Sequence, residues 1–259
     1  MFSSPRKRLQ ESMVTSPEGV RWRPGTNTAG SRQTDAEGVT GRGLNEYGDI
    51  FVDTIMDKAR GNRVLDWGAG KNAAFGRSLV KALEGNVEVH SLSPEYTDED
   101  LERLKEFHAA RGFAQNLPYE DNYFKYIAGN QVHKHFPDRA HYLQALAELS
   151  RVLDYGGVAH LGPALPDDEA HRLISEGKTS PEWKNKRNES PKKVEHDTEH
   201  WVFLYDDAPP TPEERKQYGI PDTVRITKKS KIHAVARGVL GVKTNVILEK
   251  AAAEESATT

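Results

Sequence analysis

The chain has 259 residues, of which 36% are hydrophobic, a net charge of -3 at pH 7 and no cysteine. This length suits one α/β domain with extensions. The charge excludes a uniformly basic nucleic-acid-binding protein, and the lack of cysteine excludes disulfides and thiolate metal sites. No apolar run reaches membrane-spanning length, and no apolar stretch follows the basic N-terminus as in a secretory signal. We expect a cytoplasmic protein, with a mitochondrial presequence left open.

Residues 1–44 are rich in Ser, Thr, Gly and Arg and show almost no periodic apolar pattern. Such a composition buries too little apolar surface to offset the entropy lost on ordering. The sequence therefore predicts a disordered N-terminal tail over 1–44, a folded domain over 45–250 and a second disordered tail over 251–259.

Helix and strand patterns alternate from residue 52 onward. Apolar residues recur at helical spacing or form short runs, Thr97 with Asp100 resembles a capping box, and Gly156–Gly157 is a stop signal. These patterns predict helices over 52–59, 75–83, 97–104 and 138–156, and strands over 64–65, 87–92, 112–114, 124–128 and 158–161. The alternation indicates an α/β fold with a parallel sheet and helices on both faces.

The patterns become weaker after Pro166. Residues 167–176 fit a helix, 201–205 a strand, and 224–226 and 244–248 the last two strands, with a helix-like stretch at 232–240. Residues 177–222 are otherwise polar and contain several prolines. We interpret them as an irregular insertion and a candidate cover for an acceptor site.

A strand that ends in an acid and a glycine loop stands at Arg63-Val-Leu-Asp-Trp-Gly-Ala-Gly-Lys-Asn72. A strand, a tight loop and a helix N-terminus together present backbone N–H groups and a positive dipole end to a ligand. The glycines also fit a purely structural strand-to-helix turn. The order Gly68-x-Gly70-x-x-Ala73 also satisfies a relaxed dinucleotide-binding pattern.

The order Asp66-x-Gly68-x-Gly70 resembles the cofactor loop of class I S-adenosylmethionine-dependent methyltransferases. Three further segments resemble that family in order and spacing: Asn116–Phe124, His135–Asp138 and Glu148–Gly157. The resemblance implies a Rossmann-like, doubly wound, mostly parallel seven-stranded sheet. It also implies S-adenosylmethionine as the cofactor and a methyl acceptor of small-molecule type.

The same resemblance implies a set of cofactor-binding residues: Asp66, Gly68, Ala69, Gly70, Ser91, Leu92, Asn116, Leu117, Asn130 and Tyr47. Two of the family's acidic positions are not acidic here. Ser91 stands where a carboxylate would bind the ribose hydroxyls, and Phe113 stands where an acid is often found near the adenine. Neutral hydrogen bonds contribute about 1 kcal/mol and charge-assisted ones about 1.5–3, so either the affinity for the cofactor is reduced or backbone groups and stacking compensate for the missing acids.

His133 and His135 follow the predicted strand 124–128, at the end of the sheet where ligands bind in α/β folds. Either could act as a general base for a hydroxyl or ammonium acceptor. The alternative is that both are solvated turn residues. Methyl transfer otherwise demands mainly proximity and orientation, because the sulfonium is already activated.

Two other patterns carry weaker functional interpretations. His196-Asp-Thr-Glu-His200 matches a zinc-peptidase pattern by chance, because its flanks are polar and no third ligand stands out, so no metal is expected. The basic residues of Arg225–Lys243 could contact nucleic acid or an acidic partner, but a solvated sheet edge explains them better.

The leading hypothesis is methyl transfer to an unidentified small molecule. A degenerate methyltransferase-like binding or scaffold protein is the alternative, suggested by Ser91 and Phe113, and a dinucleotide-dependent oxidoreductase is a third reading. The sequence does not indicate an oligomeric state.

Overall fold

The structure is a computed structural model that describes residues 14–15, 21–22, 44, 49–130, 132, 136–162, 180–181, 207–235 and 239–253. Its helices are α2 (Asp49–Ala59), α3 (Ala74–Ala82), α4 (Asp98–Arg103), η2 (Lys105–Phe107), α5 (Arg139–Val152) and α9 (Pro212–Tyr218). Its strands are β1 (Val14–Thr15), β2 (Arg21–Trp22), β3 (Arg63–Trp67), β4 (Glu88–Leu92), β5 (Phe124–Asn130), β6 (Leu153–Gly162), β7 (Ser180–Pro181), β8 (Val224–Val235) and β9 (Val239–Lys250).

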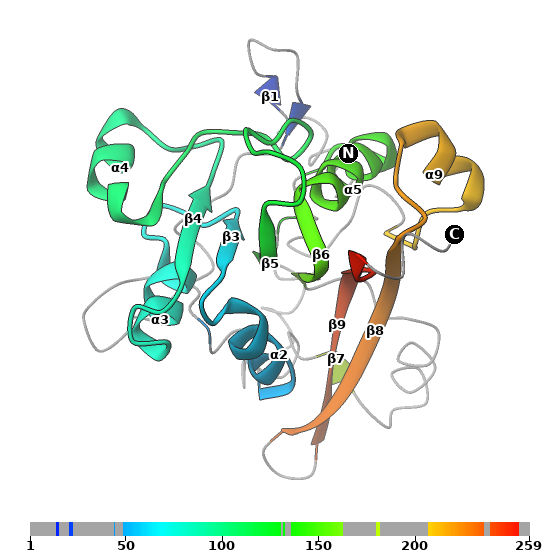
Figure 1. The fold of residues 1–259 in the computed structure, drawn as a ribbon. Coiled ribbons are helices and arrows are strands. Elements are labelled where there is room, and N and C mark those ends of the chain that lie inside the picture. Colours follow the sequence, from blue (N-terminus) through cyan, green and yellow to red (C-terminus); the bar gives the residue numbers. More distant parts are fainter. Residues whose placement is uncertain are drawn as a thin grey trace, which may run out of the picture.

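A seven-stranded sheet forms the centre of the fold, in the order β4-β3-β5-β6-β9-β7, with β8 paired to β9 (Figure 1). Strands β4, β3, β5 and β6 are mutually parallel, whereas β9 runs antiparallel to both β6 and β8. The expected α/β class with a mostly parallel, Rossmann-like sheet is confirmed. The carboxyl ends of β3, β4 and β5 consequently lie at the same end of the sheet, where the loops that follow the strands can form a ligand site.

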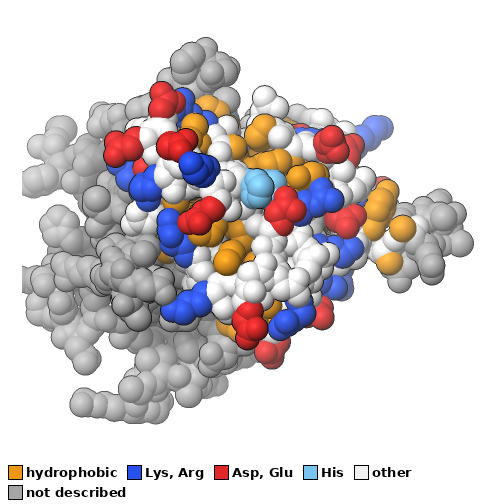
Figure 2. Space-filling view, turned by 60° about the vertical axis from the view of Figure 1, so that its left-hand side comes forward, with side chains coloured by type: hydrophobic (Ala, Val, Ile, Leu, Met, Phe, Trp, Pro, Cys, Tyr) orange, Lys and Arg blue, Asp and Glu red, His pale blue; other side chains and the backbone are white. Residues whose placement is uncertain are grey.

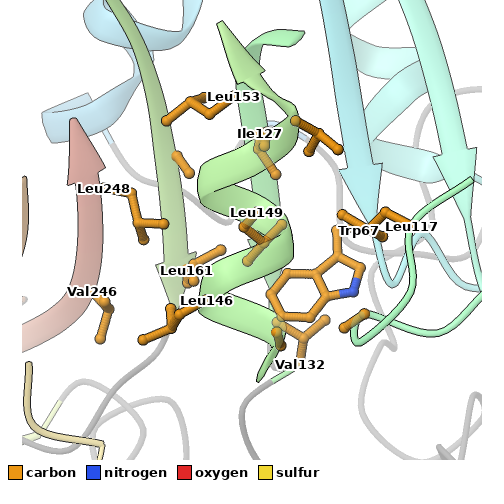
Figure 3. Packing of buried hydrophobic residues seen from close by; sticks show 14 of the residues in the cluster. Trp67, Leu117, Ile127, Val132, Leu146, Leu149, Leu153, Leu161, Val246 and Leu248 are labelled. Atoms are coloured by element: carbon orange, nitrogen blue, oxygen red, sulfur yellow. The ribbon is translucent and has the colours of Figure 1, made fainter. Parts of the chain in front are cut away.

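Side chains that alternate along the strands build a core on each face of the sheet. On one face Val64 of β3 packs in a cluster with Ile55 of α2 and Leu79 of α3. On the other face Leu65 and Trp67 join the apolar side of α5, as Figure 3 shows for Leu146 and Leu149. Helices therefore cover both faces, as the sequence predicts.

The prediction of a helix-like stretch at 232–240 is wrong. Strands β8 and β9 instead form a long antiparallel hairpin whose register runs from Val224–Lys250 to Val235–Val239. In β8, Val224 and Ile226 are buried and Arg225 between them is exposed, which is the alternation of a strand. The predicted strands at 224–226 and 244–248 are confirmed and belong to this hairpin.

The expected end of the helix 138–156 is also wrong. Helix α5 ends at Val152, because Leu153 is already extended (φ -70°, ψ 128°), and β6 begins there. Gly156, with φ +67°, lies inside β6, and its N–H donates to the carbonyl of Ala251 at 3.2 Å. The two glycines thus serve an irregular start of the strand rather than a helix stop.

Two further local expectations change. Residues 112–114 form no strand, and only isolated bridges join Leu92 to Ala110 and Phe113 to Asn116. Helix α9 lies within the range expected to be irregular, and a capping box of Thr211 and Glu214 begins it. That Thr-x-x-Glu signal was visible in the sequence.

Some expectations concern stretches that the structure does not describe. The helix at 167–176 and the strand at 201–205 fall there, as does most of the predicted tail 1–44. Leu44 donates its N–H to Ser78 Oγ at 2.8 Å, and Ala251 donates to the carbonyl of Thr223 at 2.8 Å. The domain boundaries stay predictions. Among the described residues, no helix is both long and apolar enough to cross a membrane.

Candidate cofactor site

The glycine loop follows β3 directly and is tied to the end of β4. Gly68 and Gly70 adopt the left-handed conformation, with φ of +73° and +64°. The N–H groups of Gly68 and Ala69 both donate to the carbonyl of Leu92, at 2.9 and 3.2 Å. A Cβ at Gly68 would lie 2.4 Å from Cγ1 of Val132, so a side chain at this position meets both backbone strain and a steric clash.

Two arginines hold the second half of the loop. Arg77 of α3 donates from Nε to the carbonyl of Asn72 at 3.0 Å, and Arg103 of α4 donates to the carbonyl of Lys71 at 2.5 Å. Helix α3 then begins with no side-chain cap on its N-terminus and no acid in its first turn. The partial positive charge at this helix end, where Asp66 uses the N–H of Gly76, lies beside the loop.

Asp66 is buried below the loop and contacts helix α3. Its Oδ2 accepts a hydrogen bond from the N–H of Gly76 at 3.4 Å. Burial raises the pKa of Asp66 to about 7, and the hydrogen bond from Gly76 opposes part of that rise. Asp66 therefore anchors the strand end to α3 with a carboxyl group that holds its proton up to neutral pH.

Ser91 on β4 is the register partner of Asp66 on β3 and is fully buried. Its Oγ lies near α3, 3.7 Å from where a Cβ at Gly76 would stand. Tyr96, 3% exposed, brings a second hydroxyl close to Ser91 and Asp66, but neither hydroxyl meets hydrogen-bond geometry with any described group. Burial raises the pKa of Tyr96, and the nearby Asp66 carboxylate adds to the rise. Two neutral hydroxyls with unused bonding capacity thus lie beside the loop.

Asn116 and Leu117 are placed by helix α5. The N–H of Leu117 donates to Glu148 Oε2 at 2.9 Å, and its buried side chain packs in the same cluster as Trp67 and Leu92. Asn116 is exposed and donates its N–H to the carbonyl of Phe113 at 3.1 Å. Both positions lie on the segment that passes the end of β4.

The structure gathers six of the predicted cofactor-binding residues at the carboxyl ends of β3 and β4: Asp66, Gly68, Ala69, Gly70, Ser91 and Leu92. The backbone of Asn130 ends β5 beside Gly162. Tyr47, His133 and His135 lie outside the described residues. Sequence reasoning missed Tyr96, Arg77 and Arg103, and no local pattern marks their contacts with this site.

The segment that carries this geometry matches a known protein family. Residues 65–161 match the family model described as "Methyltransferase domain". They contain the glycine loop, β4, the Leu117 segment and α5. This part of the chain is therefore similar to methyltransferase domains.

Two curated relatives are demethylmenaquinone methyltransferases of staphylococci. The Staphylococcus haemolyticus protein is 35% identical over 103 residues, which cover 38% of this chain and 41% of that protein. The Staphylococcus saprophyticus protein is 34% identical over 110 residues, 40% and 45% of the two chains. The matched region thus spans less than half the length of these relatives.

The chain is also similar, at low sequence identity, to several solved structures. A methyltransferase from Methanosarcina mazei is 15% identical, with a TM-score of 0.44, over 77% of this chain and 97% of that one. The YcgJ protein from Bacillus subtilis is 17% identical, with a TM-score of 0.42, over the same shares of the two chains.

Proposed function

We propose that this chain transfers a methyl group from S-adenosylmethionine to a small-molecule acceptor. The observation that carries the proposal is the left-handed glycine loop at Gly68–Gly70, joined to Leu92 at the end of β4, within the segment that matches the methyltransferase family. A loop of this kind lets a ligand approach the backbone closely.

The residues present fit the cofactor. Glycine at position 68 lets a ligand approach the loop backbone closely, and the positive end of the α3 dipole lies beside the loop, whose N–H groups at Gly68 and Ala69 are themselves bonded to Leu92. The hydroxyls of Ser91 and Tyr96, which have no hydrogen-bond partner among the described residues, supply neutral hydrogen bonds in place of the family's acid. Bound S-adenosylmethionine supplies a methyl group on an activated sulfonium, so the chain's own task is to orient the two reactants and exclude water.

The acceptor is proposed from the curated relatives. Both act, by their names, on demethylmenaquinone, so we take an aromatic quinone-type small molecule as the acceptor class. His133 and His135 remain candidate general bases for an acceptor that must lose a proton. Tyr47 and residues 177–222 remain candidates for the acceptor-side wall of the site.

The function is tested by titrating the full chain with S-adenosylhomocysteine and, separately, with NAD in a calorimeter. The proposal expects one S-adenosylhomocysteine per chain and no heat with NAD. Heat with NAD alone would favour a dinucleotide enzyme and overturn the proposal. Incubation with S-adenosylmethionine and a reduced demethylnaphthoquinone, read by mass spectrometry, should then yield a product heavier by one methylene unit.

The same experiment addresses the scaffold alternative. This chain has Ser91 where the family has an acid that binds the ribose. The serine makes no charge-assisted hydrogen bond, so we expect the affinity for the cofactor to be about tenfold lower. Binding of S-adenosylhomocysteine without methylation of any quinol or phenol tested would favour a binding protein. If the chain neither binds S-adenosylhomocysteine nor methylates an acceptor, both the enzyme hypothesis and the binding-protein hypothesis are contradicted.

A further inference from the structure

Three potential metal ligands meet at the edge of the sheet formed by β4, away from the glycine loop. Glu88 and His90 stand two positions apart on β4, so they share one face of the strand. His108 follows the short helix η2. One ligand atom from each of the three side chains lies within 4.8 Å of the other two.

His90 is the fixed member of this cluster. Its side chain is buried, and its ring is held edge-on by Tyr119, Tyr123 and Phe124, with centroid distances of 5.6, 5.4 and 5.3 Å. Its Nε2 lies 2.8 Å from Oε1 of Glu88. A ligand held in one orientation by its packing loses little further freedom when a metal binds.

His108 is brought over His90 by the backbone. It ends η2 in the left-handed conformation (φ 43°, ψ 45°), and its ring stacks on that of His90 with centroids 4.6 Å apart. Two residues later, Ala110 donates its N–H to the carbonyl of Ser91 at 2.9 Å and accepts from the N–H of Ser93 at 3.2 Å. These bonds fix the segment that carries His108 against the free side of β4.

Glu88 and His108 are exposed, so their side chains can adjust around the fixed ring of His90. Figure 2 shows this edge of the molecule, with a histidine at the surface beside acidic and basic side chains. Glu88 also lines a surface hollow at the amino ends of β3, β4 and β5 together with Asn86 and Arg63. The cluster is therefore open to ions from solvent.

We propose that Glu88, His90 and His108 bind a divalent transition-metal ion, with Zn²⁺ as the best-suited ion. Two imidazole nitrogens and one carboxylate oxygen form a donor set that Zn²⁺ prefers, with a fourth position left for water. Bond lengths of about 2.0–2.2 Å place tetrahedral ligand atoms about 3.4 Å apart. Rotation of the two exposed side chains brings the cluster to that spacing.

The ion replaces the hydrogen bond between His90 and Glu88. The proton on Nε2 of His90 leaves to solvent while Nδ1 takes one up, so the ring stays neutral and the Nε2 lone pair binds the ion. Calcium and magnesium prefer sites built from oxygen ligands, so the two imidazoles disfavour them. Arg63 adds a positive charge near the cluster, but its guanidinium stacks over the ring of Tyr123 at 4.1 Å and faces solvent, which screens it.

Binding would cross-link β4 to the 105–110 segment. That segment bonds to the backbone of Ser91, which belongs to the candidate cofactor site. The ion therefore stabilises one wall of that site without touching it. The proposal does not depend on methyl transfer, because metal binding can be measured with neither cofactor nor acceptor present.

The test is titration of the metal-free full chain with Zn²⁺, compared with a His108→Asn variant. Asn tolerates the left-handed backbone of this position and lacks the imidazole, so the variant keeps the fold. We expect one Zn²⁺ per wild-type chain and at least tenfold weaker binding by the variant. With Co²⁺, the absorption bands of a four-coordinate site should appear in the wild type and disappear in the variant.

Two controls address the other histidines. His141→Asn changes a histidine that pairs with Asp138 on α5, and the double variant His196→Ala/His200→Ala removes the chance zinc pattern of the sequence. Both controls should bind Zn²⁺ like the wild type. Absence of stoichiometric binding by the wild type, unchanged binding by His108→Asn, or loss of binding in the double variant would each overturn the proposal.

Discussion

The backbone N–H of Leu117 donates a hydrogen bond to the carboxylate of Glu148, 31 positions later in the chain, at 2.9 Å. Arg151, one turn further along α5, binds both carboxylate oxygens of Glu148 at 2.9 and 2.8 Å and the carbonyl of Leu117 at 3.1 Å. Helix α5 thereby fixes the segment that contributes Asn116 and Leu117 to the candidate cofactor site.

Glu148→Gln should lower the free energy of unfolding by about 1–3 kcal/mol, because a neutral amide weakens the paired contacts with Arg151 and Leu117. Urea denaturation measures this change. Glu102→Gln is the matched control, since Glu102 forms an exposed pair with Lys105 and should change stability by less than about 0.5 kcal/mol. Equal stability of the two variants would contradict the role of Glu148.

Lys250 is buried and donates to Asn122 Oδ1 and to the carbonyls of Ser150 and Leu153, at 2.7, 3.0 and 2.8 Å. Lys250→Met keeps the apolar stem but leaves these acceptors without their donor. We expect the free energy of unfolding to fall by about 1–3 kcal/mol in urea denaturation. The exposed Lys105→Met should leave it within about 0.5 kcal/mol of the wild type, and an equally mild effect at Lys250 would refute this prediction.

Asp66 should make stability depend on pH. Its pKa is about 7 in the fold and 3.8 in a model compound, so the native state retains a proton that the unfolded chain loses. Its contribution to stability is therefore fully present below about pH 4 and is lost as the pH rises through about 7. The wild type should therefore lose stability relative to Asp66→Asn, whose side chain does not titrate, by up to about 1.4 kcal/mol per pH unit over that range. A difference in unfolding free energy that stays constant with pH would contradict the raised pKa of Asp66.

Ser91→Ala should separate stability from binding. The buried Ser91 hydroxyl has no hydrogen-bond partner within the described part of the chain, so its removal should leave the unfolding free energy unchanged or raise it by up to about 1 kcal/mol. Affinity for S-adenosylhomocysteine should fall by about fivefold to tenfold, which corresponds to one neutral hydrogen bond.

Ser150→Ala is the control. Ser150 is equally buried, but it lies near the C-terminal end of α5 and its hydroxyl donates to the carbonyl of Leu146 at 2.7 Å. This variant should lose stability and keep its affinity. If Ser91→Ala leaves the affinity unchanged, Ser91 does not contact the ligand.

The glycine loop was predictable because its conformation depends on local chemistry. Two left-handed positions require glycine or tolerate little else, and both stand in one short run after an apolar strand. The helices over 52–59 and 75–83 were predicted for a similar reason, since one apolar face repeats every three to four residues. In such cases neighbouring residues alone determine the structure.

The hairpin of β8 and β9 shows where local reading fails. Ile232, Val235, Val239 and Leu240 fit helical spacing, yet they pair across the hairpin, because β9 offers β8 a partner along its whole length. The contacts of Tyr96 with Ser91 and Asp66, and of His108 with Glu88 and His90, also join separate segments. Neither cluster has a sequence signature, so only the fold brings them together.

The central claim is that the cofactor binds at the Gly68–Gly70 loop, and it is tested most directly by comparing two glycine variants. Gly68→Ala adds a side chain at a left-handed position against Val132, whereas Gly85→Ala imposes similar backbone strain (φ +80°) at a site with open space, remote from the loop. Calorimetric titration with S-adenosylhomocysteine, on samples whose thermal unfolding shows a folded chain, gives the comparison. The account predicts wild-type affinity for Gly85→Ala and at least tenfold weaker binding for Gly68→Ala, and wild-type affinity in both would contradict it.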